Sequence, residues 1–366
     1  MPGKVTVVGA GFYGSTTAMR LAEYNIFDTV VLTDILEGKP EGLALDMNQS
    51  RSIEAGGGFV AGVSTAHRPN SAATTRRGEG IIEFLLRASA AIGIVTTVGI
   101  ITVLVVEAFF FFAEVSPVDF FTGTRWSASI LPYAFGVIPL ITSTLMIAFI
   151  ALVLAVPLGV LAAVWMSEFA SQRVRSIIKP ILEILAGIPT IVYGFFAITV
   201  ITPLLKATIL PDLGTFSALS AGIVVGILVL PLVASLTEDA LRAVPRGLRE
   251  GSYALGATRW ETVRRVLLPA ALSGIAAAVI LAMSRAVGET MAVVLAAGTN
   301  PQLTLNPTES VQTMTAFIVQ ISLGDTPAES IQFKALFAVG ATLFAITFTL
   351  NLISAWLVAR YRNVYE

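Results

Sequence analysis

Long apolar stretches alternate with shorter polar segments from residue 81 onward. Six of them are long enough for a bilayer, whose hydrocarbon core requires about 20 residues of helix. They lie at about 84–112, 135–165, 181–205, 219–236, 266–298 and 335–358. The second and fifth are long enough to tilt or to include interfacial turns. The pattern therefore predicts an α-helical membrane protein, with a six-span bundle over residues 81–366.

The first 55 residues have a different pattern. A short β-branched strand precedes Gly9, Gly11 and Gly14, which have the spacing G-x-G-x-x-G, and a second strand ends at Asp34. In a Rossmann fold such glycines let the backbone approach a pyrophosphate at a helix N-terminus, and the acid binds the ribose. The pattern predicts a short, incomplete Rossmann-like β-α-β segment over residues 1–55. The alternative is a glycine-rich turn that binds nothing.

Residues 56–80 are mostly small, polar and basic, which predicts a flexible linker. His67, the single histidine of the chain, lies in this segment. We expect it to be a solvated linker residue and not an acid–base catalyst. One β-α-β unit buries little apolar surface, so the head formed by residues 1–55 is expected to be marginally folded.

The head also resembles a known family. The segments "GAGFYGSTTAMRLAE" and "LTDILEGKPEGLALDM" are similar to the amino-terminal part of malate and lactate dehydrogenases, over residues 3–54. The resemblance implies NAD as the ligand of the glycines and the acid named above. It also implies a longer fold with a catalytic histidine and substrate-binding arginines, and those segments are missing here. We therefore expect no dehydrogenase activity, and NAD binding stays an alternative for this segment.

Composition agrees with a membrane protein. The chain is 55% hydrophobic and 13% charged, with a mean hydropathy of +0.82, whereas soluble domains are about 45–50% apolar and about 25% charged. It contains no cysteine, which excludes disulfides and thiolate metal sites, and no metal site is predicted. It also lacks the G-x-x-x-x-G-K-[ST] loop that holds a triphosphate, so ATP hydrolysis is expected in another chain. No nucleic-acid partner is expected.

Basic residues are unevenly distributed among the loops. Segments rich in Lys and Arg alternate along the chain with loops that hold only three basic residues, Arg125, Lys206 and Lys334. The basic-rich segments hold Arg76, Arg77, Arg87, Arg173, Arg175, Lys179, Arg242, Arg246, Arg249, Arg259, Arg264, Arg265, Arg360 and Arg362. Because cytoplasmic loops carry the excess of Lys and Arg, both termini are predicted to be cytoplasmic, in a bacterial cytoplasmic (inner) membrane.

The loop between the fourth and fifth predicted spans reads "EDALRAVPRGLREGSYALGATRWETVRRVLLPA". Charged residues alternate there with apolar ones at helical spacing, which predicts two short amphipathic helices on the cytoplasmic face. We expect a turn at Gly256 and an end at Pro269, where the next span begins. The alternative is a helix pair lying on anionic lipid.

This loop resembles the coupling segment of ABC importer permeases, with the form E-A-A, three residues, G, nine residues, I-x-L-P. The resemblance implies a coupling helix that docks into a groove of the ATPase subunit. Leu255 and Trp260 are expected to fill that groove. The residues in this register are Glu250, Gly251, Ser252, Gly256, Leu268 and Pro269. Gly251 and Ser252 stand in place of the two alanines, and Val266 stands in place of the isoleucine.

Four further segments resemble phosphate-importer permeases of the PstC type, and the likeness covers about residues 77–366. They are "LAGIPTIVYGFF", "PLVASLTEDALRAVP", "SRAVGETMAV" and "LTLNPTESVQTMTAFIVQISLGD". The resemblance implies a permease subunit of a phosphate importer, without a cofactor or enzymatic activity of its own. It implies as partners a second homologous permease, a cytoplasmic ABC ATPase dimer that uses ATP, and an external phosphate-binding protein. The alternatives are another oxyanion, sulfate or molybdate, or an NAD-binding, malate dehydrogenase-like protein that acts through residues 3–54.

Arg285 lies inside the fifth apolar stretch, and Glu289 follows it by one helical turn. A charge at membrane depth costs about 2.5–3.5 kcal/mol, so it is expected to face the bundle interior, a partner or water. The guanidinium offers paired donors to phosphate oxygens. We therefore predict that Arg285 is a cationic waypoint, a residue that binds phosphate as it passes. Glu289 is predicted to hold the Arg285 side chain or to compete with phosphate for it. The alternative is a buried ion pair that locks the helix.

Overall fold

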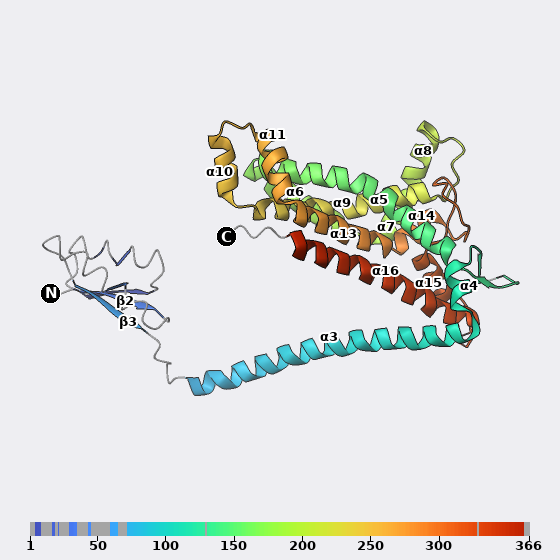
Figure 1. Ribbon diagram of the computed structural model, residues 1–366, viewed down its shortest axis with the longest axis horizontal. Helices are drawn as coiled ribbons and strands as arrows, with labels where there is room; N and C mark the ends of the chain where they lie inside the picture. The colour runs from blue at the N-terminus through green and yellow to red at the C-terminus, as the bar shows by residue number, and fades with distance from the viewer. Residues whose placement is uncertain are drawn as a thin grey trace. The chain divides into compact units, whose positions relative to one another are not determined.

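The structure is a computed structural model that describes residues 4–8, 17–18, 21, 29–34, 43–44, 59–64, 72–128, 130–327 and 329–361. It is predominantly helical (Figure 1). The chain divides into two compact units, Met1–Val95 and Thr96–Glu366. The first contains a small sheet and the second contains the helical bundle.

The sheet of the first unit has three parallel strands in the order β1-β2-β3. Val30 and Leu32 of the central strand are fully buried and pack with Ala18 and Ala44. The parallel pairing of the first two strands agrees with the predicted β-α-β pattern. The strands are β1 Lys4–Val8, β2 Thr29–Asp34 and β3 Phe59–Ser64.

The segment expected to be a linker is not one flexible stretch. Residues 59–64 pair with β2 along its whole length as β3, because Val60 and Val63 belong to a run whose β propensity suits a strand. Helix α3, Ala72–Glu114, begins well before the predicted first span. Its upstream residues include alanines, arginines and a glutamate, which are good helix formers. Its part that is apolar enough to cross a membrane is Ile82–Glu114.

Among the described residues, five helices are long and apolar enough to span a membrane, or six if a bent pair is counted as one span. The predicted number of six spans agrees with the second count. The straight spans are Ile82–Glu114, Ile138–Phe169, Thr190–Thr208, Ala218–Ala243 and Ile331–Arg360. Their helices are α5 Ile138–Val164, α7 Thr190–Phe196, α8 Thr202–Thr208, α9 Ala218–Ala243 and α16 Ile331–Tyr361, with the π-helical segments η1 Trp165–Phe169 and η2 Ala197–Ile201.

The third span begins later than predicted. Residues 181–187 belong to a separate amphipathic helix, α6 Gln172–Gly187, and not to the span. The break lies at Ile188 and Pro189, which are both extended, because the residue before a proline disfavours the helical conformation. The hydroxyl of Tyr193 donates a hydrogen bond of 2.7 Å to the Leu185 carbonyl and joins the two helices across this break.

The fifth predicted span is also broken. Its first part is continuous with the hairpin before it and bends by 70° between Ala270 and Leu272. Helix α13 then ends at Val287, and a new helix begins after Gly288. The helical elements between α9 and α16 are α10 Arg246–Ala254, α11 Arg259–Thr262, η3 Val263–Leu267, α12 Leu268–Ala270, α13 Leu272–Val287, α14 Met291–Ala297 and α15 Met314–Leu323.

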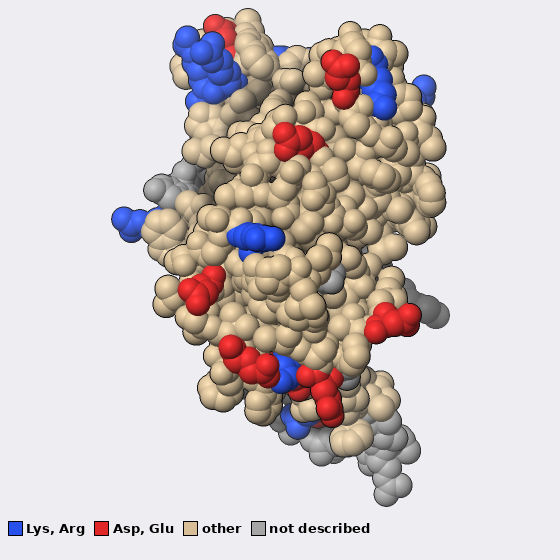
Figure 2. Space-filling view, turned by 90° about the vertical axis from the view of Figure 1, so that its right-hand side faces the viewer, with Lys and Arg blue, Asp and Glu red and all other residues tan. Residues whose placement is uncertain are grey.

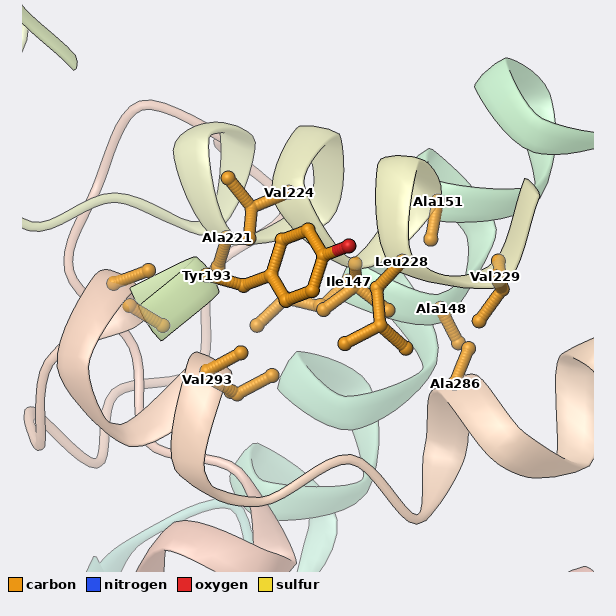
Figure 3. Packing of buried hydrophobic residues seen from close by; sticks show 14 of the residues in the cluster. Ile147, Ala148, Ala151, Tyr193, Ala221, Val224, Leu228, Val229, Ala286 and Val293 are labelled. Atoms are coloured by element: carbon orange, nitrogen blue, oxygen red, sulfur yellow. The ribbon is translucent and has the colours of Figure 1, made fainter. Parts of the chain in front are cut away.

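The core of the bundle is the contact between α5 and α9 (Figure 3). Gly222 and Gly226 of α9 are one turn apart and lie against α5. A Cβ atom at Gly222 would stand 2.6 Å from the Cβ atom of Ile150, closer than side chains pack. Small residues at this spacing let two membrane helices approach closely. Alanines and valines, together with Ile147 and Leu228, contribute most of the buried side chains of α5 and α9.

The two ends of the bundle differ. The α10–α11 hairpin lies at one end, and α4, Pro117–Thr122, lies with α8 and α15 at the other (Figure 1). At the second end two short strands, β4 Trp126–Ser127 and β5 Ala134–Phe135, pair in an antiparallel sheet. Figure 2 views this end and shows charged side chains in isolated groups on a largely uncharged surface.

Candidate functional site

A cavity of about 300 Å³ lies between α6, α9 and α13. Its apolar wall includes Leu228 and Pro231 of α9. Its ionisable lining residues are Lys179 and Glu183 of α6, Glu238 of α9, and Arg285 of α13. The cavity thus combines two cationic side chains with two carboxylates beside a predominantly apolar bundle.

Arg285 stands in the last turn of α13. Its side chain is exposed and lines the cavity. Among the described residues, no carboxylate oxygen lies within 4.0 Å of its guanidinium nitrogens. A guanidinium at a cavity wall with no carboxylate within ion-pair distance has donors available for an anion.

Glu289 is not the ion-pair partner that its sequence spacing suggested. Because α13 ends at Val287, Glu289 does not follow Arg285 on the same helix. It is 8% exposed, and its Oε1 accepts a hydrogen bond of 3.4 Å from the backbone N–H of Ala292. Its backbone carbonyl accepts a hydrogen bond from Thr315. Glu289 therefore lies at the start of α14, and the structure does not bring the two charges together.

A buried charge cluster beside the cavity was not anticipated from the sequence. The Glu238 carboxylate is fully buried on α9 and contacts the guanidinium of Arg175 directly. Lys179 Nζ lies 3.7 Å from its Oε2, and Arg242 Nη1 lies 3.9 Å from its Oε1. The only sequence signal was an acidic pair, Glu238 and Asp239, at the end of an apolar span. The cluster holds α6 against α9.

The predicted hairpin is present. Helices α10 and α11 are joined by a turn in which Gly256 has φ +83°, a left-handed conformation that favours glycine. Thr258 and Glu261 form a capping box at the start of α11, with an N–H to Oε2 distance of 2.9 Å. The hydroxyls of Ser252 and Thr262 lie 2.9 Å apart and join the two helices. These contacts define the shape of the hairpin without a partner.

The tip of the hairpin presents apolar side chains to solvent. Leu255 is 90% exposed and Trp260 is 53% exposed. Glu250 and Gly251 are also exposed, whereas Leu268 is half-buried. Pro269 does not end the second helix as predicted, because that helix continues to Ala270 before the 70° bend. Exposed leucine and tryptophan beside charges are typical of a protein docking surface.

The site predicted in the first unit is only partly within the described residues. Gly9, Gly11 and Gly14 lie outside them, and so does His67. Asp34 is the last residue of β2, in register with Ser64 of β3. It therefore stands at the carboxyl edge of the parallel sheet, the edge at which such sheets bind ligands.

Two protein families match this chain. The model for the "binding-protein-dependent transport system inner membrane component" family matches residues 155–363. The model for the "lactate/malate dehydrogenase, NAD binding domain" family matches residues 3–67. The second match includes β3 and extends past residue 54, where the resemblance was predicted to end.

Curated relatives match the larger part of the chain. The probable ABC transporter permease protein YqgH of Bacillus subtilis is 36% identical over 247 residues, which are 67% of this chain and 79% of the relative. The phosphate transport system permease protein PstC of Mesorhizobium japonicum is 32% identical over 263 residues, 66% of this chain and 78% of the relative. A probable PstC of Methanocaldococcus jannaschii is 31% identical over 288 residues, 72% of this chain and 90% of the relative.

Solved structures agree on the fold. A bacterial alginate ABC transporter, in complex with an alginate-bound periplasmic protein, has a chain that superposes with a TM-score of 0.55 at 16% identity. The match covers 77% of this chain and 96% of that one. The likeness is to the fold alone, and the resemblance to ABC importer permeases is confirmed by the family match.

The match to the transport family covers more than half of the chain, whereas the dehydrogenase match is confined to its start. The matched region holds α9, the hairpin and α13, and therefore both the cavity and the exposed tip. Proteins of this kind are permeases and not enzymes. The chain is an integral inner-membrane protein that belongs to the family of binding-protein-dependent transport system inner membrane components.

Proposed function

We propose that this chain is the membrane permease subunit of an ATP-driven ABC importer for inorganic phosphate. The observation that carries the proposal is the unpaired guanidinium of Arg285 at the wall of a cavity inside the bundle. A planar cation with several N–H donors suits a tetrahedral oxyanion. The names of the relatives, phosphate transport system permease proteins, favour phosphate over sulfate or molybdate.

We assign the proposed partners to the two ends of the bundle. The exposed hairpin tip at Leu255 and Trp260 is the proposed contact with a cytoplasmic ATPase dimer, with Glu250, Gly251 and Ser252 at its first helix. An external phosphate-binding protein would dock at the opposite end, near α4 and α8. A second homologous permease completes the pathway between the two membrane subunits. We infer from the basic residues of the loops that both termini are cytoplasmic.

Uptake of labelled phosphate tests the proposal. The full chain is expressed with its partner subunits in cells that lack their own phosphate permease. We expect uptake with the wild-type chain and none with Arg285→Gln at equal membrane abundance. Arg173→Gln is the matched control, because Arg173 is an exposed arginine of α6 that does not line the cavity. Normal uptake by Arg285→Gln overturns the role of Arg285, and uptake of sulfate or molybdate instead of phosphate overturns the substrate.

We infer that the dehydrogenase-like head takes no part in a hydride-transfer reaction. Its match to an NAD-binding domain ends at residue 67, and residues 155–363 match a transport family instead. NAD as a regulatory ligand is the competing proposal. NADH titrated into membrane vesicles during transport separates the two, because a regulatory head predicts a change of uptake rate.

A further inference from the structure

We propose that Lys179 is a second cationic waypoint for phosphate, between Arg285 and the cytoplasmic end of the pathway. The proposal rests on the proposed function, since it requires that an oxyanion passes Arg285. It assigns a substrate-binding role to a residue of α6, a helix that the sequence pattern had merged with the third span.

Lys179 lies where two cavities meet. The first is the cavity of about 300 Å³ that Arg285 lines. The second, of about 360 Å³, is lined by Arg175, Lys179 and Arg242, with Glu183. Lys179 and Glu183 line both cavities. An anion that leaves Arg285 toward the second cavity therefore passes the ammonium group of Lys179.

The contacts of Lys179 leave its ammonium group able to bind an anion. Its Nζ lies 3.7 Å from Glu238 Oε2 and 3.6 Å from Asp239 Oδ1. Both distances exceed the usual length of a hydrogen bond. Arg175, in contrast, contacts the Glu238 carboxylate directly. Lys179 is also 36% exposed, whereas Arg175 is 14% exposed. Of these two partners of Glu238, Lys179 is the one that an anion can recruit without breaking a close ion pair.

Glu238 makes this arrangement suitable for release. Its fully buried carboxylate offsets part of the positive charge of Arg175, Lys179 and Arg242. A pathway needs sites that bind an ion well enough to admit it and weakly enough to release it. A lysine is a compact charge on a flexible stem that can turn between two neighbours. Glu238 is therefore a positioning residue that keeps the second waypoint weak.

The absence of cysteine from the sequence permits a direct test. Lys179→Cys introduces the one thiol of the full chain, and Arg173→Cys, an exposed position on the same helix and outside both cavities, is the matched control. Both variants are expressed with their partner subunits. We expect Lys179→Cys to lower phosphate uptake severalfold and Arg173→Cys to leave it unchanged. Modification of Cys at position 179 with aminoethyl methanethiosulfonate, which restores a positive charge, should recover uptake, and the neutral hydroxyethyl reagent should not.

Restoring the positive charge would also recover uptake if Lys179 had only a structural role. A second measurement therefore distinguishes binding of phosphate from a structural role. In inside-out vesicles, inorganic phosphate should slow modification at position 179 severalfold, and chloride at the same ionic strength should not. Phosphate should not protect position 173. Unchanged uptake by Lys179→Cys, or no protection by phosphate while the wild-type chain imports phosphate, overturns the waypoint and leaves the proposed function standing. A wild-type chain that imports no phosphate overturns both.

Discussion

The carboxylate of Glu168 lies 3.2 Å from Nη2 of Arg249 and joins the end of the second span to the first helix of the hairpin. The same nitrogen donates a hydrogen bond of 2.7 Å to the carbonyl of Leu241 in α9. The two side chains are only 8% and 19% exposed. One arginine thus ties α10 to the ends of two spans.

Replacing Arg249 by glutamine should destabilise the protein. Removal of one partner leaves the Glu168 carboxylate nearly buried and unpaired, and breaking a buried pair costs roughly 3–5 kcal/mol. Because Arg249 is partly exposed, we expect the free energy of unfolding to fall by an amount near the lower end of that range. Thermal unfolding in detergent micelles should show a lower Tm than for Arg246→Gln, an exposed arginine on the same helix. Equal Tm values for the two variants would show that the pair does not stabilise the fold.

Leu255→Ser should separate transport from stability. Leu255 is 90% exposed, so its loss removes little buried surface within this chain, while the proposed ATPase contact loses an apolar anchor. We expect an unchanged Tm, weaker co-purification of the ATPase subunit and lower phosphate uptake. Leu323→Ser is the matched control, because Leu323 is 81% exposed but lies at the end of α15. Undiminished co-purification with Leu255→Ser would contradict the docking role of the hairpin tip.

Gly222→Ala should destabilise the bundle, although alanine is the better helix former. The added Cβ atom would meet the Ile150 side chain at 2.6 Å, and overpacking of this kind costs about 1–3 kcal/mol. Gly247→Ala on α10 is the control, because no atom lies within 4 Å of its added Cβ and alanine favours a helix by about 0.5–1 kcal/mol. Unfolding in detergent should therefore shift in opposite directions for the two variants. A stabilised Gly222→Ala variant would mean that α5 can move aside.

Removal of residues 1–71 should leave phosphate uptake unchanged. The cut preserves α3 from Ala72 onward and every element that lines the cavity or forms the hairpin. The measurement compares uptake by residues 72–366 with uptake by the full chain at equal membrane abundance, with and without NADH. Loss of uptake in the shorter chain, or an effect of NADH on the full chain alone, would give the head a working role.

The sequence predicts best where a local signal decides the structure. Apolar length predicted the spans, and Gly256 between two amphipathic segments predicted the hairpin, because a left-handed turn favours glycine. The division of the third span from α6 was missed, although Pro189 carried the signal, because apolar residues continue on both sides of it. The proposed roles of Arg285 and of the hairpin remain predictions.

The charge cluster could not be predicted in the same way. Glu238 is buried because Arg175 and Lys179, far from it in sequence, are brought to it by the packing of α6 on α9. The sequence spacing suggested Glu289 as the partner of Arg285, but the end of α13 at Val287 separates them. Pairings of buried charges depend on where helices end and cross, which is a tertiary property.

The 70° bend at Ala271 gives the hairpin and the cavity a mechanical connection. One stiff arm carries Trp260 and the other carries Arg285. If the bend keeps its angle, a displacement along the axis of the first arm moves the second arm mainly sideways, across its own axis. A swing moves the guanidinium across the cavity wall instead of along the helix axis. A short stroke at the exposed tip would thus change which charges Arg285 faces.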